Sequence, residues 1–232
     1  MPNSGHFDPA FIIDQVNESE FDLVIVRVPA LTAGTLIREL SQSLDVLVAE
    51  TLLKFICHDR ELESIQVDWN TEGKVRSGLY SDASAVFEIA HAAFKDHRSH
   101  FSANPIFDPE LINLGYAEWA TSELKNQDVF LVHEIGEVMS GFLSLQIENP
   151  NSTIVLNAVN PIMQGRGIYK SLLREALRIA SEKGAKSVSI STPSTNPRPI
   201  NVWIQNGFKY SDASITLHIL NSKRHSFVLN TI

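Results

Sequence analysis

The chain has 232 residues, of which 44% are hydrophobic and 20% are charged, a composition typical of one large globular domain or two small ones. This composition excludes a disordered chain and a coiled coil. Nineteen basic residues against 27 acidic ones give a net charge of −8. No overall basic field is available to hold a polyanion, so we expect no nucleic-acid partner.

The sequence predicts neither a membrane segment nor a signal peptide. Its most apolar stretches, 23–28 and 44–57, contain charged side chains and end well before the roughly 20 residues that a membrane helix needs. Residues 1–6 lack the basic and apolar regions of a signal peptide, and the one cysteine, Cys57, cannot form an internal disulfide. We therefore expect a cytoplasmic protein with no membrane partner, in which Cys57 belongs to the core.

The first third of the chain mixes strand and helix patterns. A strand is predicted over 21–28, a short amphipathic helix over 35–43, and one or two further strands over 46–58. The polar run 68–74 is typical of a domain boundary. These patterns predict a small α+β N-terminal domain over 1–74.

The remaining residues, 75–232, are predicted to form a second domain of helices and strands. Helical spacing and period-two alternation predict its elements in chain order: helices over 82–94 and 108–124, strands over 129–134, 138–148 and 153–159, a helix over 165–183, a strand over 188–192, a helix over 197–206 and a strand over 214–220. Short turns between the first three of these strands predict an antiparallel meander. The predicted fold class is therefore α+β, with a mixed, mostly antiparallel sheet flanked by helices.

A strand, a short loop and a long helix meet at Gln164-Gly165-Arg166-Gly167. Small residues at 165 and 167 leave the amides of the first helical turn accessible, and those amides together with the positive end of the helix dipole form an anion site. A pyrophosphate fits such a site. Glycine at a tight strand-to-helix turn also has a purely structural explanation, so this motif alone leaves both interpretations open.

The loop and the segments that follow it resemble the GNAT acetyltransferase superfamily over residues from about 75 to 220. The phosphate motif of that superfamily, Gln-x-x-Gly-x-Gly/Ala, matches Gln164 and Gly167, with Tyr169 at the last position. A later motif, Asn-x6-Tyr-x3-Gly-Phe, matches Asn196 and the pair Gly207-Phe208. Trp203 stands at the tyrosine position of this second motif.

The resemblance implies how acetyl-CoA binds. The strand over 153–159 separates from the strand over 188–192, and pantetheine lies in the gap as an added strand. One main-chain amide of that gap faces the thioester carbonyl and stabilises the oxyanion that develops when an amine attacks directly. The implied binding residues are Asn157, Ala158, Val159, Gln164, Gly165, Arg166, Gly167, Ile168, Tyr169, Asn196 and Trp203. No metal is expected.

The general acid of the family is missing from this sequence. A tyrosine at the Trp203 position commonly protonates the departing thiolate, and an indole N–H cannot serve as that acid. Three alternatives stay open: the thiolate leaves unassisted or through water, another group such as Tyr210 supplies the proton, or catalysis has been lost. Trp203 is otherwise expected to pack beneath pantetheine.

The general base is also unassigned. Thr153 stands at the strand start where some family members carry Glu. A protonated amine needs only to lose a proton before it attacks, and a water chain ending at His100, Glu118 or His133 is a candidate route.

A mixed basic and aromatic set is predicted to bind the acyl acceptor. Its members are Arg98, His100, Phe101, Tyr116 and Trp119, which lie between the first two helices of the second domain, where GNAT-like folds admit the acceptor. Arg98 and His100 are suited to a nucleotide diphosphate, and an aromatic ring is suited to stacking on thymine or sugar. The alternative is that the aromatic residues belong to the core and that His97 and His100 form a solvated turn.

Segments 99–105 and 116–119 are similar to the dTDP-fucosamine acetyltransferase group of amino-sugar N-acetyltransferases. The sequence therefore predicts an acetyl-CoA-dependent N-acetyltransferase for a small-molecule amine, with a nucleotide-linked amino sugar as the preferred acceptor. Another primary amine is the alternative substrate, and a catalytically silent acyl-CoA-binding or regulatory module is the alternative function. The role of residues 1–74 stays open between shaping the acceptor pocket, forming a homodimer face and completing the sheet.

Overall fold

Eight strands form one mixed sheet in the order β1-β8-β2-β7-β6-β5-β4-β3. The structure is a computed structural model that describes residues 8–58, 61–62 and 72–221. Its strands are β1 (Leu23–Pro29), β2 (Asp45–His58), β3 (Lys74–Ser77), β4 (Val129–Ile135), β5 (Val138–Gln146), β6 (Asn151–Val159), β7 (Ser187–Pro193) and β8 (Lys209–Leu220). Its helices are α1 (Pro9–Glu18), α2 (Ala30–Leu40), α4 (Ala83–Phe94), α5 (Pro109–Asn126), α6 (Ile168–Glu182) and α7 (Pro197–Gln205), with short 3₁₀ turns η1 (Tyr80–Asp82), η2 (Phe101–Ala103) and η3 (Pro161–Met163).

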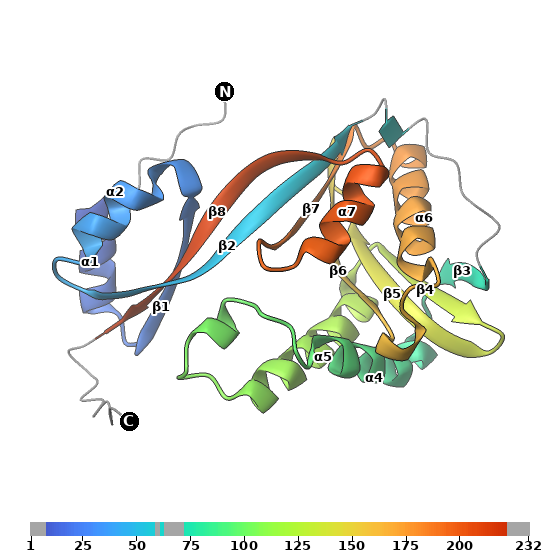
Figure 1. The fold of residues 1–232 in the computed structure, drawn as a ribbon, viewed down its shortest axis with the longest axis horizontal. Helices are drawn as coiled ribbons and strands as arrows, with labels where there is room; N and C mark the ends of the chain where they lie inside the picture. The colour runs from blue at the N-terminus through green and yellow to red at the C-terminus, as the bar shows by residue number, and fades with distance from the viewer. Residues whose placement is uncertain (1–7, 59–60, 63–71, 222–232) are drawn as a thin grey trace.

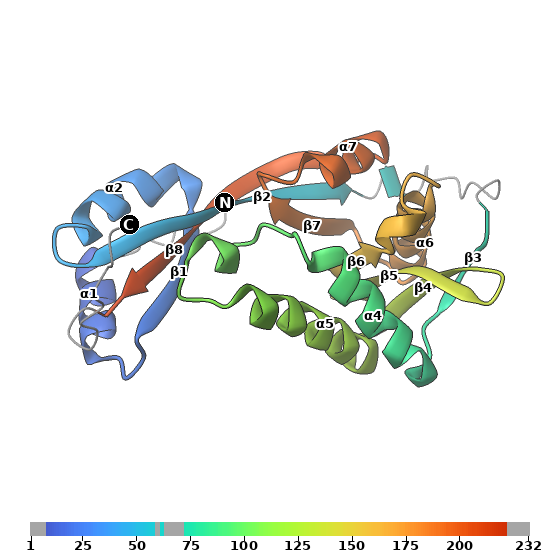
Figure 2. The same ribbon diagram turned by 60° about the horizontal axis from the view of Figure 1, so that its bottom comes forward.

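Side chains that alternate along the central strands pack against helices on the two faces of the sheet. Leu131 and Leu143 face a hydrophobic cluster that includes one side of α6. Their neighbours Phe130 and Phe142 face the opposite cluster, beneath α4 and α5. This alternation is the period-two pattern of strands whose two faces are both covered, and Figures 1 and 2 show the helices on opposite faces of the sheet.

The N-terminal elements form a third cluster at the far end of the sheet. Helices α1 and α2 pack their buried residues, among them Leu36 and Leu40, against Leu217 and Ile219 of β8. The long strands β2 and β8 connect this end of the molecule to the part that holds β7 and α7 (Figure 1). β2 pairs with both β7 and β8, so the N-terminal segment contributes a central strand to the same sheet.

The predicted boundary at 68–74 lies mostly outside the described residues, and the division into two domains stays a prediction. The predicted α+β class is confirmed: β4, β5 and β6 form the expected antiparallel meander, and among the strand pairs of the described residues only β6 and β7 run parallel. Within the described ranges, no helix is long and apolar enough to cross a membrane.

Several predicted boundaries are wrong for local reasons. The helix predicted from Gly165 begins at Ile168, because Gly165 and Gly167 have left-handed φ angles of 82° and 80° that no helix accommodates. The helix predicted over 35–43 begins earlier, at Ala30, directly after Pro29. Helix α1 and strand β3 were not predicted: α1 buries only Ile12 and Val16, and β3 has four residues, so neither gives a periodic pattern of useful length.

The packing of α2 provides a test of the fold. Leu36 is 4% exposed in the N-terminal cluster, whereas Leu31 on the same helix is 97% exposed. Leu36→Ala is expected to lower the free energy of unfolding by about 2–5 kcal/mol, because it removes buried methyl groups and leaves a cavity. Leu31→Ala is the matched control, with an expected change within about 0.5 kcal/mol. Urea denaturation measures both, and equal effects would contradict the observed orientation of α2.

Candidate active site

The sheet opens between its two parallel strands. β6 and β7 pair only from Asn151 to Thr153, opposite Ser187 to Ser189. A side-chain hydrogen bond of 3.0 Å between Thr153 Oγ1 and Ser189 Oγ lies at the last pair. Beyond it β7 continues along β2 and β6 continues along β5, so the two strands diverge.

The main chain of β6 presents unpaired groups to this opening. Leu156 exchanges both main-chain hydrogen bonds with Ser144 Oγ of β5, and the Asn160 N–H donates to the Ser140 carbonyl. Residues 156, 158 and 160 therefore direct their main-chain groups toward β5. Because successive residues of a strand alternate, the main-chain groups of Val155, Asn157 and Val159 point toward the opening. Of the three residues that the resemblance implied, Asn157 and Val159 face the gap, whereas Ala158 faces β5.

The loop before α6 has the conformation of an anion cradle. Gly165 and Gly167 both adopt left-handed conformations, with Gly167 as the residue before the first turn of α6. Open space surrounds the position of a Cβ at Gly165, so its glycine is explained by φ rather than by crowding. The first amides of α6 have no intrahelical acceptor. Gln164 and Arg166 lie exposed beside them, as a phosphate-binding loop requires.

Tyr169 and Trp203, the two residues that depart from the family motifs, contact each other. The Trp203 indole N–H donates to the Tyr169 hydroxyl at 2.5 Å. Trp203 is 2% exposed and packs edge-on against Phe55, with ring centroids 5.5 Å apart. Burial of its hydroxyl raises the pKa of Tyr169. A phenol group therefore lies beside the position where the family carries its tyrosine.

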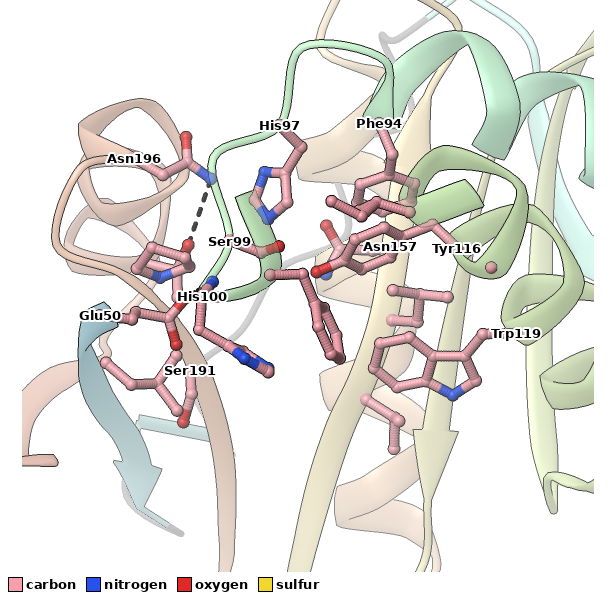
Figure 3. Close-up of a pocket in the computed structure, with 18 of the residues that line it drawn as sticks. Glu50, Phe94, His97, Ser99, His100, Tyr116, Trp119, Asn157, Ser191 and Asn196 are labelled. Atoms are coloured by element: carbon pink, nitrogen blue, oxygen red, sulfur yellow. Dashed lines mark hydrogen bonds between the residues drawn. The ribbon is translucent and has the colours of Figure 1, made fainter. Parts of the chain in front are cut away.

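A cavity of about 900 Å³ begins at the strand opening and extends to α5 and the η2 turn (Figure 3). From the predicted acetyl-CoA set, Asn157, Asn196 and Trp203 line it. From the predicted acceptor set, His100, Phe101, Tyr116 and Trp119 line it. Arg98 instead lines a neighbouring hollow that shares Glu50 and Ser99 with this cavity. The structure thus brings four of the five predicted acceptor residues and three of the eleven predicted acetyl-CoA residues to one cavity.

Arg27 and Glu50 are among the charged residues of the cavity wall that sequence reasoning missed. Both come from N-terminal strands that carry no motif, and only the pairing of β1 and β2 with β8 brings them to this site. Ser191, which also lines the cavity, lies at the diverging end of β7. Asn196, from the family motif, donates to Thr192 Oγ1 at 3.2 Å and thereby fixes the turn before α7 (Figure 3).

Hydrogen bonds determine the proton positions on His100. Asn104 Oδ1 accepts from the Ile106 N–H, so its Nδ2 donates to His218 Nδ1 at 3.2 Å. His218 Nε2 then carries a proton and donates to His100 Nδ1 at 3.0 Å. His100 therefore carries its own proton on Nε2. Burial, and after it the neighbouring His218, lowers the pKa of His100 to about 4, so this side chain is a neutral donor rather than a proton acceptor near pH 7.

The other predicted proton carriers lie outside the lining of the cavity. Glu118 is exposed on α5, and Tyr210 is exposed on β8. His133 is buried in β4, where its Nδ1 pairs with Ser140 Oγ at 2.6 Å. None of these three side chains therefore contacts the cavity directly. Glu50 is the buried carboxylate that does line it.

Cys57 lies in the core, as expected. Burial, followed by the nearby Glu61 carboxylate, raises the pKa of its thiol to about 12, which excludes a reactive thiolate near pH 7. Among the residues that the structure describes, no group of three or more His, Cys, Asp or Glu side chains could hold a metal ion.

Comparison with known proteins identifies the family. The chain matches the model of the Acetyltransferase (GNAT) family over residues 86–208, just over half of its length. No curated protein matches the sequence. The chain belongs to the GNAT acetyltransferase family and is therefore an acyltransferase of the N-acetyltransferase type.

Solved structures share the fold at low sequence identity. A GCN5-related N-acetyltransferase from Sphaerobacter thermophilus is 18% identical, with a TM-score of 0.62 over 96% of this chain and 68% of that one. A GCN5-related N-acetyltransferase from Kribbella flavida is 12% identical, with a TM-score of 0.62 over 91% and 76%. The PaiA N-acetyltransferase from Thermoplasma acidophilum, solved in complex with coenzyme A, is 21% identical, with a TM-score of 0.52 over 62% and 96%. GNAT folds bind acetyl-CoA, and the strand opening and glycine loop described above fit that ligand.

The buried histidines predict how stability depends on pH. Burial lowers the pKa of His97, His100, His133 and His218 in the folded protein, whereas the unfolded chain protonates histidine near 6.5. The unfolded state therefore binds more protons below that value, and the free energy of unfolding is expected to fall as the pH decreases from about 7 to about 5. The raised pKa of Glu50 has the opposite effect on the free energy of unfolding, but it is one group against four histidines. Urea unfolding at both pH values measures the change, and equal midpoints would refute it.

The contact between Tyr169 and Trp203 predicts a second effect on stability. Tyr169→Phe leaves the buried Trp203 N–H without its acceptor, so the free energy of unfolding is expected to fall by about 1–3 kcal/mol. Tyr80→Phe is the matched control, because Tyr80 is 74% exposed and its ring is retained; the expected change is within about 0.5 kcal/mol. Thermal and urea denaturation of both variants would show whether the hydroxyl contributes to stability.

Proposed function

We propose that this protein transfers the acetyl group of acetyl-CoA directly to the primary amine of a small molecule held in the cavity. The observation that carries the proposal is the continuity of three features: the glycine loop at α6, the unpaired main chain of β6, and the cavity that begins at the strand opening. In this arrangement the loop holds the pyrophosphate and the N–H and C=O groups of Val155, Asn157 and Val159 hold pantetheine. A main-chain N–H near Asn157 stabilises the developing oxyanion.

The departing thiolate does not require a protein acid in this proposal. A thiol has a pKa near 8.5, so a thiolate leaves and takes a proton from water at modest cost. Trp203 forms part of the cavity wall, and its N–H is already bonded to Tyr169. The rival function, a silent acyl-CoA-binding module, is motivated by this missing acid and predicts binding without turnover.

A nucleotide-linked amino sugar is the acceptor class that the sequence resemblance favours. Aromatic rings in the cavity, among them Tyr116 and Trp119, are suited to stacking on a base or sugar. The guanidinium of Arg27 is the cationic group among the described lining residues, and Arg98 lies in the adjoining hollow. Turnover of such a sugar beside other amines tests this acceptor class.

The glycine loop provides the test of the acetyl-CoA site. Gly167→Glu places a negative charge against the phosphate cradle and is expected to weaken acetyl-CoA binding by about 100-fold or more. Gly167→Asn is the matched control, because Asn tolerates the left-handed conformation better than other residues, and its expected loss is within about tenfold. Isothermal titration calorimetry measures the affinities, and release of free thiol with an amine panel measures turnover.

The two measurements separate the competing functions. Thiol release with at least one amine supports the transferase. Acetyl-CoA binding without thiol release for every amine favours the silent module. Unchanged affinity of the Gly167→Glu variant would show that the nucleotide binds elsewhere.

A further inference from the structure

Two groups of aromatic rings line the part of the cavity beyond the strand opening. Tyr116 of α5 stacks on Phe94 of α4 at a centroid distance of 4.6 Å and lies 6.0 Å from Trp119. On the η2 side, Phe101 contacts His100 at 3.9 Å and Phe107 at 5.2 Å. This part of the cavity therefore has aromatic rings on its α5 side and on its η2 side.

The hydrogen bond of Trp119 adds to the apolar character of this part of the cavity. The Trp119 indole N–H donates to Glu123 Oε1 at 3.0 Å, so the side chain presents only its ring to the cavity. Trp119 is nevertheless 42% exposed, and Leu111, about two turns earlier on α5, is 66% exposed. Covering such surfaces is favourable in proportion to the apolar area removed from water. The exposed walls therefore favour an acceptor with a flat apolar body.

The charge of the cavity is unsuited to an anionic acceptor. Its described lining contains two carboxylates, Glu50 and Asp108, and one guanidinium, Arg27. Burial lowers the pKa of His97 and His100, so both rings are neutral near pH 7. The lining thus has a net negative formal charge, which attracts an ammonium and repels a diphosphate.

Glu50 is held in place by a row of residues that crosses three strands. Thr216 of β8 is paired with Arg27 of β1 on one side and with Glu50 of β2 on the other. Arg27 Nε donates to Thr216 Oγ1 at 3.1 Å. A β-bulge at Ala49 shifts the register of β2 immediately before Glu50, and bulges of this kind re-aim a side chain. The carboxylate is 6% exposed at the cavity wall.

The Glu50 carboxylate keeps the capacity to bind a cation. Its Oε2 accepts from the main-chain N–H of His100 at 3.1 Å, and the Thr216 hydroxyl also donates to the carboxylate. The Arg27 guanidinium lies 3.7 Å from Oε1, beyond hydrogen-bond distance. The titratable and charged groups around it are Arg27, His100, the more distant Tyr116, and Arg98, which lines the adjoining hollow together with Glu50. Burial raises the pKa of Glu50, which brings its proton affinity closer to that required of a base.

Glu50 and the aromatic wall lie on opposite sides of the same space. Figure 3 shows Glu50, His100 and Ser191 on one side of the cavity and Tyr116 and Trp119 on the other. A molecule that places its amine at Glu50 therefore extends its body toward the rings. The diverging end of β7, which carries Ser191, borders the carboxylate side.

We propose that the acyl acceptor is a primary amine carried on an aromatic or similarly flat apolar body, and that Glu50 binds its ammonium and accepts its proton. The inference rests on the proposed acetyl transfer and specifies its acceptor. It differs from the amino-sugar proposal by assigning recognition to a carboxylate and to apolar rings rather than to cationic groups.

The chemical step is balanced as follows. The ammonium gives one proton to the Glu50 carboxylate, and the freed nitrogen lone pair forms a bond to the thioester carbonyl carbon. The C–S bond breaks and its electron pair leaves with the sulfur. The second proton lost by the nitrogen ends on the thiolate through water, giving an amide and free coenzyme A thiol. Glu50 then releases its proton to solvent.

A panel of three acceptor classes tests the acceptor. Thiol release is measured with acetyl-CoA and 2-phenylethylamine, spermidine or UDP-glucosamine. We expect kcat/KM for 2-phenylethylamine to exceed the other two values by about tenfold or more, as burial of an aromatic group predicts. Preference for spermidine or UDP-glucosamine would overturn the acceptor class while leaving acetyl transfer intact. Thiol release from none of the three, with acetyl-CoA still bound, would overturn the proposed function itself.

Glu50→Gln tests the role of the carboxylate, with Glu118→Gln as the matched control on exposed α5. Glu50→Gln is expected to lower kcat/KM for 2-phenylethylamine by about 100-fold, within the range for loss of a general base, while Glu118→Gln changes it by less than about twofold. Acetyl-CoA affinity measured by calorimetry is expected to stay within about threefold, which shows that the variant is folded. A loss of less than about threefold in kcat/KM would overturn the assignment of Glu50.

Two further readouts distinguish a proton acceptor from a structural ion pair. In the Glu50→Gln variant, kcat/KM is expected to rise about tenfold per pH unit up to the pKa of the amine, because only the free amine then reacts. A flat profile would overturn the proposed role as proton acceptor. Trp119→Ala is expected to raise KM for 2-phenylethylamine by about tenfold with little change in kcat. An unchanged KM would overturn the assignment of the aromatic wall.

Discussion

The site depends on one constraint, the divergence of two parallel strands that each remain paired on their outer side. Beyond Thr153, β6 stays paired with β5 and β7 stays paired with β2, and the two pairs of strands separate. The main-chain groups of Val155, Asn157 and Val159 are thereby left facing a gap. Unpaired main-chain groups are costly unless water or a ligand satisfies them, so the gap is suited to an extended ligand that completes the sheet.

The N-terminal segment has a functional consequence, although it lies outside the residues that match the family model. β1 and β2 bring Arg27 and Glu50 to the cavity, and the β8 residues between and beside them supply Thr216 and His218. The matched region forms the strand opening and the glycine loop, whereas one wall of the acceptor end comes from the added strands. In our proposal the acceptor is thus recognised by both parts of the sequence, because the aromatic wall belongs to the matched region and Glu50 belongs to the added strands.

The two departures from the family motifs form a single feature. Tyr169 stands where the family has a small residue, and Trp203 stands where it has tyrosine, and the two side chains are hydrogen-bonded to each other. The larger side chain in the first turn of α6 does not obstruct the cradle, because it packs into the core. A buried indole needs an acceptor, and this tyrosine supplies it.

The sequence by itself determined the alternation of helices and strands, the antiparallel meander, the glycine loop and most of the aromatic lining. These features depend on local periodicity, on turn chemistry or on short motifs whose members lie close together along the chain. Only the tertiary structure decided that β2 lies between β7 and β8, that His100 is a hydrogen-bond donor, and that Glu50 reaches the cavity. The first depends on strand order, and the position of Glu50 depends on a register shift in β2. The role of His100 depends on His218, which lies more than a hundred residues away along the chain. No local sequence pattern encodes such pairings.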